Sequence, residues 1–170
     1  MEPASPTHQE TAIASGACLA EATGNCACEG GPTEPEFQDL IARFQDATVP
    51  ASEFTHAAHL VVGLWHATSF DEADALPRLR AGILRLNAAH GTPNTDTRGY
   101  HETITRAYLV LLARFARANP DLRAAPLAQA LLASDLAKRE ALFSYYSREL
   151  LMSVAARREW VEPDLRRLDA

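Results

Sequence analysis

Residues 54–70, "FTHAAHLVVGLWHATSF", constrain the fold of this chain more than any other segment. When they are projected onto a helix at about 100° per residue, large apolar side chains cover nearly the whole circumference. His56, His59 and His66 share one side of this helix, within an arc of roughly 80°. A helix that is apolar around most of its circumference is usually enclosed by other helices. The segment therefore predicts the central helix of an all-α domain, with histidines that face other protein.

Helix start and stop signals recur along the rest of the chain. Thr33 and Glu36 form a capping box, and Ser69 and Glu72 form a second one. Pro77 is expected to kink or divide the helical segment that follows the second box. Gly91 closes that same segment, and stop signals end other helical segments at Pro50 and at Asn119 with Pro120. Because no alternating apolar stretch competes as a strand, the sequence predicts an irregular bundle of six or seven helices.

The first 36 residues hold the whole excess of negative charge. They contain six of the 22 acidic residues and none of the 16 Lys and Arg residues. This segment is rich in Gly, Pro, Ser and Thr and has few large apolar residues, so it has little apolar surface to offset the entropy lost on ordering. We therefore expect residues 1–32 to be a largely disordered tail and residues 33–170 to form a single helical domain.

All three cysteines, Cys18, Cys26 and Cys28, lie in this tail. The Cys-x-Cys pair could present two thiolates to one soft ion such as Zn or Cu(I). The paired Cys-x-x-Cys spacing of a zinc knuckle is missing, however, and flexible thiols in a reducing cytoplasm can stay free or act as redox-sensitive groups. The sequence leaves both interpretations of the cysteines open.

Charge and hydropathy exclude several classes of partner. A net charge of −6 at pH 7 disfavours nucleic acid, because phosphate binding needs clustered Lys and Arg. The sequence contains no apolar run long enough to span a bilayer and no basic amphipathic face. It also lacks the pattern of a secretory signal. We therefore expect a cytoplasmic protein whose partner is a small molecule, with no nucleic acid and no membrane involved.

Four side chains are candidate metal ligands. His56 and His59 are three residues apart, a spacing that lets one helix face chelate one ion. His101 and Glu102 follow a loop rich in hydrogen-bonding residues, although Glu102 could instead pair with Arg106 four residues later. We expect His56, His59, His101 and Glu102 to hold a divalent metal, Zn or non-haem Fe, with one position open for a reactant.

The segment "YYSREL" supplies the candidate catalytic groups. Tyr145 offers a phenol that can donate a proton, and Arg148 offers a guanidinium that can orient a carboxylate. The sequence contains no phosphate-binding glycine loop and no serine or cysteine nucleophile motif. These features predict a metal-dependent enzyme acting on a small molecule. The alternative is a non-catalytic helical module that binds a small ligand or has a structural role.

Four motifs taken together resemble a family of small, all-helical bacterial proteins. They are "FTHAAHL", "NTDTRGYHET", "YYSREL" and "ARREWVEPDL", and they occur in this order within residues 37–165. The resemblance implies a helical fold over that range and implies no activity, cofactor or partner. The cysteine-containing tail is not part of it.

Overall fold

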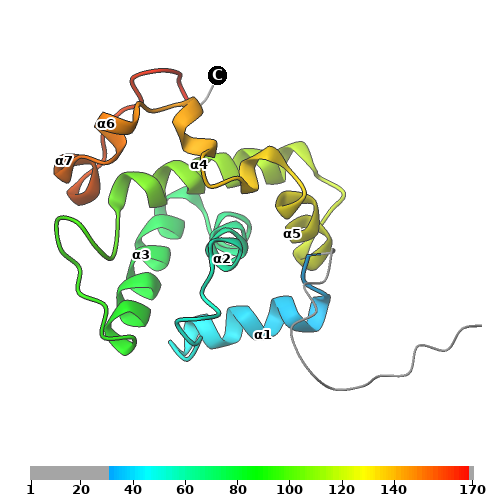
Figure 1. The fold of residues 1–170 in the computed structure, drawn as a ribbon. Coiled ribbons are helices and arrows are strands. Elements are labelled where there is room, and N and C mark those ends of the chain that lie inside the picture. The colour runs from blue at the N-terminus through cyan, green and yellow to red at the C-terminus, as the bar shows by residue number, and fades with distance from the viewer. Residues whose placement is uncertain (1–30, 169–170) are drawn as a thin grey trace, which may run out of the picture.

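The computed structural model of the chain describes residues 31–168, and all regular structure in this range is helical (Figure 1). The five longer helices are α1 (Glu34–Gln45), α2 (His56–Ser69), α3 (Glu72–Ala89), α4 (Glu102–Ala118) and α5 (Ala124–Leu132). The shorter elements are the 3-10 helices η1 (Asp135–Ala137) and η2 (Ala141–Ser144), followed by α6 (Arg148–Leu151) and α7 (Val154–Arg158). The predicted all-α fold is confirmed. The predicted tail and its three cysteines lie outside the described residues, apart from Gly31 and Pro32.

Helix α2 lies at the centre of the bundle. It contacts α1, α3, α4 and α5, and Figure 1 shows it nearly end-on between them. Most of its length is buried, including Leu60, Val61, Val62 and Leu64. The Thr55 hydroxyl caps its first turn by accepting a hydrogen bond from the Ala58 N–H at 3.3 Å. The predicted central helix is therefore confirmed, because an apolar circumference is buried only when neighbours surround it.

Local signals also account for several helix ends. At the start of α1, the Thr33 N–H donates to Glu36 Oε2 at 2.8 Å, as the first capping box predicts. Gly91 closes α3 with a φ of +63°, the left-handed conformation that glycine adopts without a steric cost. Helix α4 ends before Asn119 and Pro120. These ends depend on contacts within a few residues, so the sequence predicts them well.

The junction between α2 and α3 differs from the prediction. Helix α2 continues through Ser69, and Asp71 caps α3 by accepting a hydrogen bond from the Asp74 N–H at 2.9 Å. The ring of Phe70 lies between the two helices and packs edge-on against Trp65 at 5.3 Å. This packing keeps Phe70 out of α3 and moves the cap from Ser69 to Asp71.

Pro77 does not divide α3, which runs as one helix from residue 72 to residue 89. Proline removes one backbone hydrogen bond from the helix interior. Ala75 and Leu79, on either side of it, are both buried in the core. Burial of these two residues stabilises the helix on both sides of Pro77, so it continues as one element.

Two clusters of buried side chains stabilise the fold. The larger one lies among α1 to α5. The smaller one joins α4 to the C-terminal segment through Ala107, Leu111, Leu142, Tyr146, Leu151 and Leu168. Figure 1 shows α6 and α7 on the far side of α4 from α1. Helix α4 therefore separates the two clusters and contributes side chains to both.

Gly82 of α3 allows the close approach of α1. A Cβ at this position would lie 2.5 Å from two carbons of the Phe44 ring, which is only 1% exposed. We expect Gly82→Ala to lower the free energy of unfolding by about 1–3 kcal/mol. This loss should appear even though alanine stabilises an ordinary helix position by about 1 kcal/mol relative to glycine. Urea unfolding measures the change.

The control for this prediction is the same substitution in a Phe44→Leu background. Leucine is smaller than the aromatic ring, so Gly82→Ala should cost clearly less there. An equal cost in both backgrounds would show that contact with the Phe44 ring is not the cause.

Candidate functional site

A cavity of about 340 Å³ lies between α2, α3 and α4. This volume is within the range of small-molecule sites in proteins. Most of its wall is apolar and comes from Leu60, Val62, Leu79, Ile83, Ile104, Leu109 and Leu112. Gly63 lets α2 and α4 approach, because a Cβ there would lie 2.8 Å from Leu112 Cδ1. The cavity therefore follows from the packing of three helices around the apolar central one.

Two polar atoms in the cavity wall lack a partner. The Nε2 atom of His56 and the hydroxyl of Tyr108 are buried, and neither has a hydrogen-bond partner within residues 31–168. The two rings contact each other edge to face, with centroids 5.9 Å apart. Leaving such a group unpaired costs about 1–3 kcal/mol, so folded proteins rarely keep one. The pair indicates a place where a bound molecule would supply the missing hydrogen bonds.

Both groups are uncharged at neutral pH. Burial lowers the pKa of His56, and the guanidinium of Arg139 lowers it further. Burial raises the pKa of Tyr108, and the carboxylate of Glu140 adds to this shift. The cavity therefore offers a phenol that donates a hydrogen bond and a neutral imidazole nitrogen that donates or accepts according to its tautomer.

His59 lies in the same cavity wall, one turn along α2. Its Nδ1–H donates to the Thr55 carbonyl at 2.7 Å, and its ring tilts against Phe54 with centroids 3.9 Å apart. His59 as a whole residue is exposed, but protein atoms surround much of its ring. The resulting partial desolvation lowers the pKa of His59. His56 and His59 are thus the two predicted site residues that the structure brings together.

His101 is engaged in holding the fold. It is the N-cap of α4, where Nδ1 accepts a hydrogen bond from the Ile104 N–H at 3.3 Å. Its Nε2–H donates to the Leu151 carbonyl at 3.0 Å. Burial lowers the pKa of His101 to about 4, and the charge of Arg157 contributes to this shift. Both ring nitrogens are occupied, and His101 does not line the cavity.

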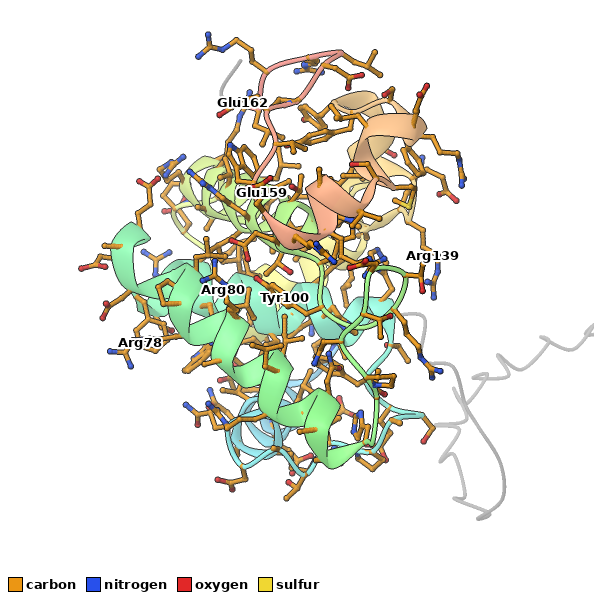
Figure 2. The ribbon with its side chains drawn as sticks, turned by 90° about the vertical axis from the view of Figure 1, so that its left-hand side faces the viewer. Arg78, Arg80, Tyr100, Arg139, Glu159 and Glu162 are labelled. Carbon is orange, nitrogen blue, oxygen red and sulfur yellow. The ribbon has the colours of Figure 1, made fainter. Side chains whose placement is uncertain are left out.

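Glu102 is also engaged elsewhere. Its carboxylate pairs with Arg80 of α3 and accepts a hydrogen bond from the Tyr100 hydroxyl at 2.8 Å. Figure 2 shows Arg80 and Tyr100 together, near Glu159. The alternative partner considered from the sequence, Arg106, instead lies 4.5 Å above the Trp160 ring.

These positions correct the prediction of a single four-ligand metal centre. His56 and His59 share the cavity, whereas His101 bonds to the Leu151 carbonyl and Glu102 pairs with Arg80 of α3. Within residues 31–168, no group of three His, Cys, Asp or Glu side chains is arranged to hold a metal ion. Helical spacing placed His56 and His59 on one face correctly, but it could not show which side chains of other elements that face would meet.

The predicted catalytic groups Tyr145 and Arg148 lie outside the cavity. Arg166 lies 5.2 Å above the Tyr145 ring, and Arg148 lies 4.9 Å above the ring of Phe143. Both residues belong to the C-terminal segment that packs on α4, and neither is among the residues that line the cavity. The structure therefore does not bring them to the two histidines.

Tyr108 and Arg139, which bring polar groups to the cavity, were not predicted as site residues. Tyr108 shares a helix face with Thr105 and Leu112, and this i, i+3 and i+4 pattern was visible in the sequence. Arg139 lies in the loop between η1 and η2 and reaches the cavity from there. A loop residue that far along the chain carries no local pattern that links it to α2.

Comparisons of the chain with known protein families, with curated proteins and with solved structures gave no match. Over residues 31–168 the structure is that of a small all-helical protein. Among the described residues, no helix has both the length and the apolar character needed to cross a membrane.

Proposed function

We propose that the protein binds a small, largely apolar molecule in the cavity between α2, α3 and α4. The observation that carries this proposal is the pair of buried, unpartnered polar atoms, His56 Nε2 and the Tyr108 hydroxyl, in an apolar cavity of about 340 Å³. One ligand oxygen placed between them would accept from the phenol and pair with the imidazole. The apolar walls would supply the remaining affinity by removing ligand surface from water.

The geometry favours binding over the metal-dependent reaction that the sequence predicts. The four candidate ligands are divided between the cavity and two structural hydrogen-bond networks. Tyr145 and Arg148 contact other side chains of the C-terminal segment. A neutral imidazole and a protonated phenol, by contrast, suffice to orient a polar group of a small molecule.

The first test uses the stability of the free protein. We expect Tyr108→Phe to leave the free energy of unfolding unchanged or to raise it by about 1 kcal/mol, because its hydroxyl has no protein partner to lose. Tyr146→Phe is the matched control, since the Tyr146 hydroxyl donates to the Val161 carbonyl at 3.1 Å. Its removal should cost about 1 kcal/mol. Equal losses in urea unfolding would show that the Tyr108 hydroxyl is already paired.

The second test measures binding. We would titrate small aliphatic alcohols and ketones and follow the amide NMR spectrum of isotope-labelled protein. Shifts should concentrate at Val62, Gly63 and Thr105, which line the cavity. His56→Leu and Tyr108→Phe should each weaken binding by about tenfold, the loss of one buried hydrogen bond. Shifts confined to other parts of the protein, or none with any compound, would overturn the proposal.

A further inference from the structure

We infer that the molecule bound in this cavity is a small apolar monocarboxylate whose carboxylate is held by Arg139. This inference rests on the proposed function and names the chemical class of its ligand. It depends on the charge of the cavity wall and on the balance of hydrogen-bond donors and acceptors there.

Arg139 is a cation without a partner at the cavity. It lines the cavity from the loop between η1 and η2, and its charge acts on both His56 and His59. Within residues 31–168 its guanidinium makes no ion pair or hydrogen bond, whereas its neighbour Lys138 pairs with Asp135 at 2.6 Å. Figure 2 shows Arg139 at the edge of the molecule, well apart from Arg78 and Arg80. Its planar donor group suits a carboxylate.

No negative charge offsets Arg139 in the wall. Among the described residues that line the cavity there is no Asp or Glu. Glu140, the next residue, is exposed like Arg139 and does not line the cavity, and its carboxylate acts on His56 and Tyr108 from outside the wall. The first turn of α2 also lacks an acidic residue, so no carboxylate in that turn offsets the partial positive charge of the helix N-terminus. The lining residues therefore carry one positive charge, that of Arg139, which favours an anion beside its guanidinium over a cation.

The free hydrogen-bonding groups are donors. The Tyr108 hydroxyl donates, and the guanidinium of Arg139 donates. Each threonine hydroxyl of the wall makes one hydrogen bond, since Thr55 accepts from the Ala58 N–H and Thr105 donates to the His101 carbonyl. A carboxylate only accepts hydrogen bonds, so it fits this set of donors, and an amine does not.

The experiment compares three probes that share one apolar chain and differ in their head group: octanoate, octanol and octylamine. Each is titrated into the full-length protein at neutral pH and moderate salt, and amide NMR shifts at the cavity walls report binding. Octanoate should bind about tenfold more tightly than octanol, because a hydrogen bond to a charged group is stronger than one between neutral groups. Octylamine should bind more weakly than either.

Two variants locate the effect. Arg139→Gln should remove the advantage of octanoate over octanol and leave the affinity for octanol unchanged. Lys138→Gln is the matched control, because it changes the net charge equally at the neighbouring position and Lys138 does not line the cavity. It should preserve the preference for octanoate, since long-range attraction between exposed charges is screened by salt.

The outcomes separate this inference from the proposed function. If octanol and octanoate bind at the cavity with equal affinity, or if Arg139→Gln weakens both equally, the carboxylate assignment is overturned and the binding function stands. The same holds if Lys138→Gln removes the preference as fully as Arg139→Gln does. If no probe shifts the cavity residues, the proposed function fails together with the ligand class.

Discussion

Replacement of Tyr146 by alanine is expected to lower the free energy of unfolding by about 3–5 kcal/mol, the usual cost of deleting a buried aromatic side chain. Tyr146 is 0% exposed and lies at the centre of the cluster that joins α4 to the C-terminal segment. Its ring meets Trp160 edge to face at 6.5 Å, and its hydroxyl donates to the Val161 carbonyl. Both contacts and the packing around them disappear in the variant.

The adjacent tyrosine provides the control. Tyr145 is partly exposed at the edge of the same cluster, and the guanidinium of Arg166 lies over its ring. Tyr145→Ala should therefore cost about 1 kcal/mol or less. Urea unfolding of both variants measures the difference. If the two substitutions cost the same, Tyr146 does not anchor the C-terminal segment in the way the structure shows.

Acidification should destabilise the protein by about 3 kcal/mol between pH 7 and pH 4 through His101 alone. Burial lowers the pKa of His101 from its ordinary value of 6.5 to about 4 in the folded state. In the unfolded chain the imidazole therefore takes up its proton at a higher pH than in the folded chain. The stability from this residue is fully present above pH 6.5 and is lost as the pH falls toward 4.

The hydrogen bonds of His101 explain why protonation is unfavourable. Nδ1 accepts the Ile104 N–H at the start of α4, so a proton on Nδ1 would face another donor. The charge of Arg157 opposes a positive imidazole as well. Protonation therefore removes the cap of α4 and places a charge in a buried site.

Denaturant unfolding across this pH range tests the prediction, with His101→Asn as the reference variant. Asparagine is a good N-cap and does not titrate. The variant should lose clearly less stability than the wild type between pH 6.5 and pH 4. Its remaining loss should reflect His56, His59 and His66, whose pKa values burial also lowers. The same pH dependence in both proteins would show that His101 does not cause it.

His66 illustrates the limit of local reasoning about a single histidine. Its place near the end of α2 suggests a ring that interacts with the helix dipole. In the structure it is buried, its Nδ1–H donates to the Val62 carbonyl at 2.8 Å, and burial lowers its pKa. A neutral ring bonded to its own helix is therefore the better description, because desolvation outweighs the dipole here.

For the candidate site as well, the sequence predicted the helix faces but not the contacts between them. The helical projection placed His56 and His59 on one face, and the periodicity of α4 placed Tyr108 on a face with Thr105. Whether these two faces meet depends on how α2 packs against α4, which no spacing within either helix determines. His101 shows this most clearly, because the carbonyl that occupies its Nε2 belongs to Leu151, 50 residues along the chain.

The amino-acid pattern by itself determined the helical class, the central position of α2 and most helix ends, because caps and apolar periodicity act over a few residues. Only the tertiary structure decided which imidazoles line a cavity and which support a helix end. It also brought Arg139 from a distant loop to the first turn of α2. The physical reason is that a buried polar group takes whatever partner the surrounding packing supplies, and that partner lies far away in sequence.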